Sequence, residues 1–215
     1  MRKDLRVLVA HEQEACRRWL AIDLAASAHV SIAGCVPADL SLIGLAATMR
    51  PDVIVLSATH EKGFGILGLL IERNPWARVI VVSAHPSGRE AFDALRCGAR
   101  GYAPIDAPAM DIVDMVRSAY RGEPSVHHSV AAGFARETLE HAAGLVQEPN
   151  NGLTERETAV LTLVAMGLPA MIMAERVSLF RRPPGAILAS ACIRLSLLGR
   201  AASTAAYDRR HLRAS

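Results

Sequence analysis

The feature that most constrains this chain is an alternation of short apolar stretches with longer amphipathic ones over its first 120 residues. The short stretches are apolar throughout, which is typical of strands that are covered on both faces. The expected strands span residues 5–10, 29–34, 52–57, 77–84 and 99–103. The expected helices span residues 13–25, 38–49, 64–73, 87–97 and 108–121. This order predicts a doubly wound (βα)₅ domain, an α/β fold built on a parallel sheet.

A second, smaller unit is expected after Glu123, where the alternation stops. Residues 128–143 have apolar side chains at helical spacing, and the polar "QEPNNG" that follows is typical of a linker. Beyond it, "LTERETAVLTLVAMG" begins with a capping box formed by Thr154 and Glu157. The pattern therefore predicts an α/β domain over 1–122, a linker helix and loop over 123–152, and a small all-α helix-turn-helix domain over 153–215.

The composition is that of a globular protein, with 51% hydrophobic and 21% charged residues. The chain contains no run of 18 apolar residues, and the apolar part of its start, "MRKDLRVLVA", is too short for a signal peptide. Its four cysteines show no metal-ligand spacing, so we expect them to be reduced and buried. The sequence thus predicts a soluble, cytoplasmic protein without a membrane partner.

The charge is unevenly distributed along the chain. From Leu153 onward there are 9 arginines and 4 acidic residues, a net charge of +5, whereas residues 1–152 carry 15 basic and 17 acidic residues, a net charge of −2. A basic tail behind a near-neutral body favours a polyanionic partner such as nucleic acid. A basic face that is merely solvated is the alternative.

Several segments, in this order, resemble a response regulator of the NarL/FixJ (LuxR-type) family. The segments are "RVLVAHEQEACRRWL", "PDVIVL", "ALRCGARGYAPIDAP" and "LTERETAVLTLVAMGL". The resemblance covers nearly the whole chain. It implies a CheY-like receiver domain joined to a LuxR-type DNA-binding domain, with double-stranded DNA and a second copy of the chain as partners.

The positions that carry the phosphorylation chemistry of such a receiver are altered here. His11 and Glu12 stand where two acidic residues would hold Mg²⁺, and Ser57 stands where the third strand would end in the phospho-acceptor aspartate. Ser83 keeps the hydroxyl at the end of the fourth strand, and Ile105 replaces the lysine that would pair with the phosphoryl group. The resemblance therefore implies a degenerate phospho-acceptor pocket and a regulator that acts independently of aspartyl phosphorylation.

Other functions of these residues are weaker interpretations. Ser57 could act as a nucleophile with His11 and Glu12, but no GxSxG elbow or oxyanion loop accompanies it. We therefore predict no enzymatic activity, no cofactor and no metal. The altered pocket could accept a small organic ligand; we instead expect side chains to fill it. His127 and His128 are adjacent, would not share a helix face, and are interpreted as linker residues.

The resemblance assigns DNA reading to residues 186–198, a helix that is apolar nearly all round. It offers few donors for base edges, and basic side chains around it could bind phosphates. The candidate DNA-binding residues are Arg176, Arg181, Arg182, Ser190, Arg194 and Arg200. Two hypotheses remain: a DNA-binding transcriptional regulator, or a non-DNA-binding interaction protein that dimerises with or antagonises an intact regulator. We expect self-association through 186–198 and the Ala-rich face of 128–143.

Overall fold

The computed structural model describes residues 4–58 and 63–143. The expected helix-turn-helix domain over 153–215 lies outside these residues, as do all six candidate DNA-binding side chains. The boundary of the linker at residue 152 also lies outside them. What the structure describes is the expected α/β domain and the helix that follows it.

The described residues contain one parallel sheet of six strands, in the order β2-β1-β3-β4-β5-β6. The strands are β1 (Leu5–Ala10), β2 (Val30–Val36), β3 (Val53–Ser57), β4 (Val79–Ser83), β5 (Gly101–Pro104) and β6 (Ser125–Val126). Five of them are the predicted strands. The sixth corrects the expectation that the alternation stops at Glu123, since Ser125 and Val126 pair in parallel with Gly101 and Tyr102 of β5. A strand of two residues is too short to show a periodic pattern.

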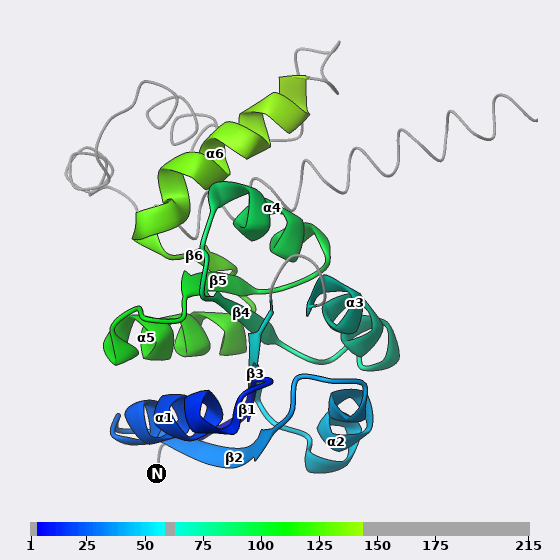
Figure 1. Cartoon of the computed structure of the whole chain (residues 1–215), viewed down its shortest axis with the longest axis vertical. Coiled ribbons are helices and arrows are strands. Elements are labelled where there is room, and N and C mark those ends of the chain that lie inside the picture. The colour runs from blue at the N-terminus through cyan, green and yellow to red at the C-terminus, as the bar shows by residue number, and fades with distance from the viewer. Residues whose placement is uncertain (1–3, 59–62, 144–215) are drawn as a thin grey trace, which may run out of the picture.

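Helices cover both faces of this sheet, as the apolar strands predict (Figure 1). They are α1 (Glu14–Ala25), α2 (Ser41–Met49), α3 (Gly63–Arg73), α4 (Gly88–Arg96), α5 (Ala109–Tyr120) and α6 (His128–Ala143). Helices α1 and α5 pack on one face, and α2, α3 and α4 pack on the other. Within the described ranges, no helix combines the length and apolarity needed to span a bilayer.

Strand β3 shows why the strands are apolar at every position. Val53 and Val55 are buried in the core under α1 and α5, whereas Ile54 and Leu56 are buried in the core under α2, α3 and α4. Successive side chains of a strand point to opposite faces, so a sheet covered on both sides needs apolar residues throughout. Packing of both faces leaves the strand ends as the place where polar side chains can gather.

On helix α1, one residue of the expected apolar face, Trp19, is partly exposed to solvent. Leu20 and Leu24 are buried, as their spacing predicts. Trp19 belongs to the same apolar pattern, yet its residue surface is 48% exposed, and Ile22 is 71% exposed. Large apolar side chains at two positions three residues apart form an uncovered stripe on α1.

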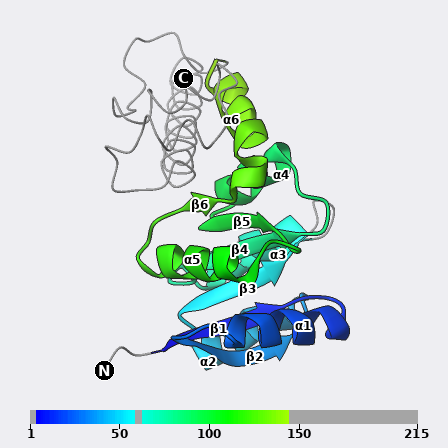
Figure 2. The same cartoon turned by 90° about the vertical axis from the view of Figure 1, so that its left-hand side faces the viewer.

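Helix α6 packs along α4 on the edge of the sheet, which Figure 2 shows from the side. Gly88 and Gly133 lie so close that a Cβ added at Gly88 would overlap the Gly133 backbone. Ala131, Phe134 and Ala135 are buried in the same core as α4. The expectation that the Ala-rich face of residues 128–143 serves self-association is therefore wrong, because this face is already covered within the chain.

Candidate functional site

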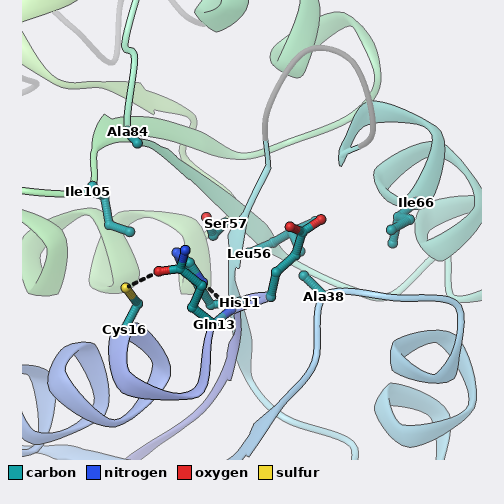
Figure 3. A pocket seen from close by; sticks show the side chains of 10 residues that line it. His11, Gln13, Cys16, Ala38, Leu56, Ser57, Ile66, Ala84 and Ile105 are labelled. Atoms are coloured by element: carbon teal, nitrogen blue, oxygen red, sulfur yellow. Dashed lines mark hydrogen bonds between the residues drawn. The ribbon is translucent and has the colours of Figure 1, made fainter.

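A cavity of about 280 Å³ opens at the carboxyl ends of β1 and β3 (Figure 3). In open parallel sheets, functional sites form at this edge because loops from several strands converge there. The lining residues are His11, Glu12, Gln13, Cys16, Ala38, Leu56, Ser57, Ile66, Ala84 and Ile105. The cavity therefore brings together four of the five predicted site residues. The expectation that side chains fill this space is wrong.

His11 follows the last residue of β1 and is half-buried at the edge of the cavity. Its backbone N–H donates to the Val36 carbonyl (3.2 Å), and its Nδ1 accepts the backbone N–H of Gln13 (2.9 Å). Burial lowers the pKa of the imidazole; the nearby Glu12 carboxylate opposes this shift, and Arg17 adds to it. Both the contact at Nδ1 and the lowered pKa favour a neutral ring at pH 7.

Arg17, in the first turns of α1, hydrogen-bonds to the loop that carries His11 and Glu12. Its guanidinium donates to the carbonyl oxygen of His11 at 2.7 Å and to that of Glu12 at 2.9 Å. The Glu12 side chain is exposed and supplies the acidic group of this loop. A guanidinium bound to two neighbouring carbonyls counteracts the attraction of this loop for a divalent cation. The sequence analysis missed Arg17, which no local motif distinguishes from other surface arginines.

Ser57 and Ile105 place a hydroxyl and an alkyl chain at two neighbouring positions of the cavity wall. Ser57 ends β3 and Ile105 follows β5; both are half-buried, and Ile105 packs against the core under α5. Figure 3 shows Ser57 near His11, with Ile105 projecting from the side of β5. The wall of the cavity is consequently mostly apolar, with the His11 ring, the Gln13 amide and the Ser57 hydroxyl as its main neutral polar groups.

Ser83 differs from the other four predicted residues, because it does not line the cavity. Its side chain is buried, and its hydroxyl donates to Glu90 Oε2 on α4 at 2.8 Å. The hydroxyl of Tyr102 on β5 donates to the same oxygen at 2.6 Å. Tyr102 is fully buried; burial raises the pKa of its phenol, and the hydrogen bond to Glu90 raises it further. Ser83, Glu90 and Tyr102 form a hydrogen-bonded network, here called the β4–α4–β5 network.

The sequence analysis did not identify Glu90 or Tyr102. The spacing Ser87-x-x-Glu90 is a helix-start signal, and Ser87 Oγ indeed accepts the Glu90 backbone N–H at 3.1 Å. That signal predicts a cap and gives no reason to expect the Glu90 carboxylate to turn toward β4 and β5. The network depends on three elements that meet only in the folded domain.

The chain is similar to several proteins with related sequence or fold. It is 27% identical over 177 residues to the DNA-binding transcriptional activator DevR/DosR of Mycobacterium tuberculosis. The aligned segment covers 81% of this chain and 81% of DevR/DosR. It is 28% identical over 165 residues to the transcriptional regulatory protein LiaR of Bacillus subtilis, covering 76% of this chain and 77% of LiaR. No family model matches the sequence.

The structural comparison gives the same fold. A two-component response regulator of the LuxR family from Aurantimonas superposes with a TM-score of 0.58 and 17% identity, covering 64% of this chain and 99% of that structure. The described part of the chain therefore has the receiver fold, and the homologues of the chain are response regulators of the NarL/LuxR type.

Proposed function

We propose that this protein is a DNA-binding transcriptional regulator that acts independently of aspartyl phosphorylation. One observation carries the proposal: in an intact receiver fold, β3 ends in Ser57, beside the neutral ring of His11 and the alkyl chain of Ile105. The fold supports a regulatory role, and these side chains argue against the phosphoryl chemistry.

The chemical argument concerns the acceptor, the metal and the counter-charge. A serine hydroxyl cannot form an acyl phosphate. Mg²⁺ requires hard oxygen ligands, whereas a neutral imidazole and one exposed carboxylate form a weak Mg²⁺ site. Ile105 has no charge to offer a phosphoryl group. Each substitution alone weakens the reaction, and together they remove the acceptor and its electrostatic support.

The direct test is labelling of the full chain with radioactive acetyl phosphate in the presence of Mg²⁺. The wild type and Ser57→Asp are both expected to remain unlabelled. The triple variant Ser57→Asp, His11→Asp, Ile105→Lys restores acceptor, metal ligand and cation, and serves as the matched positive control. A Mg²⁺-dependent, base-labile phosphoryl adduct on the wild-type protein would contradict the proposal.

DNA binding is supported by the relatives, one of which is named as a DNA-binding activator, and by the basic composition beyond residue 153. We propose that Arg176, Arg181, Arg182, Arg194 and Arg200 contact phosphates and that Ser190 and Arg194 contact base edges. Replacing Arg181 and Arg182 with alanine removes two phosphate contacts. The slope of log K against log salt should then become shallower by about 1.8, with sequence preference unchanged. If the wild type binds no duplex in this assay, the alternative below takes its place.

The alternative is a non-DNA-binding interaction protein that dimerises with or antagonises an intact regulator. A dimer interface, which both hypotheses allow, is supported by one observation on α1. Trp19 and Ile22 are exposed on one stripe, and Met110 at the start of α5 is 58% exposed nearby, with its sulfur 3.9 Å from Ser27 Oγ. We propose that this α1–α5 stripe binds a second copy of the chain. Ile22→Asp should shift the full chain from dimer to monomer in analytical ultracentrifugation, whereas Ile22→Val should not. A dimer that survives Ile22→Asp would refute this interface.

The cavity supports a small-molecule partner as a further element of the proposal. Its volume of about 280 Å³ is near the lower limit of ligand sites, and its wall is apolar with a few polar groups. A small, uncharged organic molecule matches this wall. Ala84→Leu should fill the cavity and abolish fragment binding observed by ligand-detected NMR. Fragment binding that Ala84→Leu leaves unchanged would exclude this site.

A further inference from the structure

A cluster of three metal-ligating side chains lies away from the strand-end cavity, where α5, β6 and α6 meet. Asp111 is in the first turn of α5, His127 connects β6 to α6, and His128 is the first residue of α6. One ligand atom of each residue lies within 4.8 Å of the other two. Because Asp111 lies 16 and 17 positions before the two histidines in the chain, only the folded domain brings it beside them.

The interpretation of the two histidines as linker residues does not fit His127, whose side chain is buried and packs against the His128 ring. His127 precedes α6, so the helical spacing that separates adjacent side chains does not apply to this pair. The centroids of the two rings are 4.1 Å apart, with an interplanar angle of 38°. His127 is 8% exposed, while His128 is exposed to solvent. One imidazole is thus buried, and the other lies at the surface against it.

His127 is oriented from both ring nitrogens. Its Nε2 lies 3.1 Å from Asp111 Oδ2, and its Nδ1 lies 2.8 Å from Ser129 Oγ. A metal-binding histidine needs one nitrogen for the ion and a hydrogen-bond partner for the other, which orients the ring. In this structure Nδ1 also accepts the backbone N–H of Ser129 at 3.3 Å, so an ion at Nε2 requires the ring proton to move to Nδ1, where the Ser129 hydroxyl can accept it. The arrangement supplies both requirements.

We propose that Asp111, His127 and His128 form a binding site for a divalent ion of the Zn²⁺ class. Two imidazoles and one carboxylate are ligands that Zn²⁺ takes in proteins, with metal–ligand distances that place tetrahedral ligand atoms roughly 3.3 Å apart. Asp111 and His127 already have this separation, and rotation of the exposed His128 side chain brings in the third ligand. Water completes the coordination. The bound ion joins α5 to the first turn of α6 and so clamps the linker helix to the receiver domain.

The test uses the untagged full chain, freed of metal with a chelator and titrated with Zn²⁺ against a chromophoric competitor. His128→Ala alters an exposed side chain and should lose one equivalent of Zn²⁺, or at least tenfold in affinity at that site. Asp111→Asn should weaken the same site by at least tenfold. His29→Ala is the matched control, because His29 faces Asp4 (3.7 Å) in an exposed pair; it should retain wild-type binding.

A second measurement tests whether the bound ion holds the start of α6 against α5. In hydrogen exchange, Zn²⁺ should increase protection of the backbone amides at the start of α6 in the wild type and in His29→Ala, and should not do so in His128→Ala. Unchanged thermal unfolding of the metal-free His128→Ala variant would show that its fold is intact. Equal Zn²⁺ stoichiometry and affinity in the wild type, His128→Ala and Asp111→Asn would overturn the proposal, as would an equal loss in His29→Ala.

Discussion

The strand-end cavity and the α4–α6 junction are packed in opposite ways. Around the cavity, Ser57 and Ile105 leave about 280 Å³ open. At the junction, Gly88 and Gly133 bring two backbones together, and Glu90 on the same helix α4 accepts hydrogen bonds from Ser83 and Tyr102. The comparison indicates that the side chains around Ser57 and Ile105 leave open space, whereas the linker helix is held by a close contact between two backbones.

The largest change in unfolding free energy is expected for a substitution at Gly88, where the α4–α6 junction has no space for a side chain. Gly88→Ala places a methyl group against the Gly133 backbone, which must move, so α6 should separate from α4 at a cost of about 3 kcal/mol in unfolding free energy. Urea denaturation with hydrogen exchange across α6 measures both consequences.

Two glycine variants serve as controls for this effect. A Cβ at Gly133 would lie 3.2 Å from Gly88 Cα, which a shift of a few tenths of an ångström relieves, so Gly133→Ala should change stability by less than about 1 kcal/mol. Gly44 on α2 has open space around it, and Gly44→Ala should stabilise the fold by about 1 kcal/mol. Equal destabilisation by all three variants would contradict the close contact of the two backbones.

The next effect concerns the hydrogen bonds of the junction. Tyr102→Phe removes one of the two hydroxyl donors to Glu90 Oε2 and should cost about 1–3 kcal/mol in unfolding free energy, because only the Ser83 hydroxyl then still donates to this oxygen. Ser83→Ala should have an effect of the same sign. A double-mutant cycle between these two variants measures their coupling, and strictly additive effects would show that the three residues do not act as a network.

Substitutions at the cavity should be tolerated much better. Ala84→Leu adds three carbons where space is available, so we expect unfolding free energy to change by less than about 1 kcal/mol, in contrast to the single carbon added in Gly88→Ala. Thermal unfolding of Ala84→Leu and Gly88→Ala under the same conditions measures the difference in stability between the two variants. A loss from Ala84→Leu as large as that from Gly88→Ala would remove the distinction between the two regions.

The smallest expected effect is a pH dependence that originates at His11. Burial lowers the pKa of this ring in the folded state. Below the ordinary histidine value of 6.5, the unfolded chain therefore binds the proton more readily, so His11 makes the protein less stable as the pH falls from 6.5 through the folded-state pKa. His11→Gln should reduce this loss in urea titrations between pH 7 and pH 5. An identical pH profile for the variant would contradict the assignment.

The fold and most of the site residues could be predicted from the sequence because they depend on local patterns. Strands that are apolar at every position imply a doubly covered parallel sheet, and such a sheet brings its strand ends together. His11, Glu12, Ser57 and Ile105 each follow or end a strand, so their meeting at one cavity followed from the order of elements. Strand β6 was missed, since two residues carry no period.

Only the tertiary structure decided which side chains meet across elements. Glu90 had a local reason to begin α4 but none to reach Ser83 and Tyr102, and the volume left at the cavity depends on how neighbouring side chains pack. The Ala-rich pattern of residues 128–143 was expected to serve self-association, whereas Ala131 and Ala135 are buried in the same core as α4 of this chain. The pair His127 and His128 appeared to be a linker feature until β6 and α6 placed it beside Asp111. Periodicity reports which face of an element is apolar, whereas partners and voids depend on distances between residues far apart in the chain.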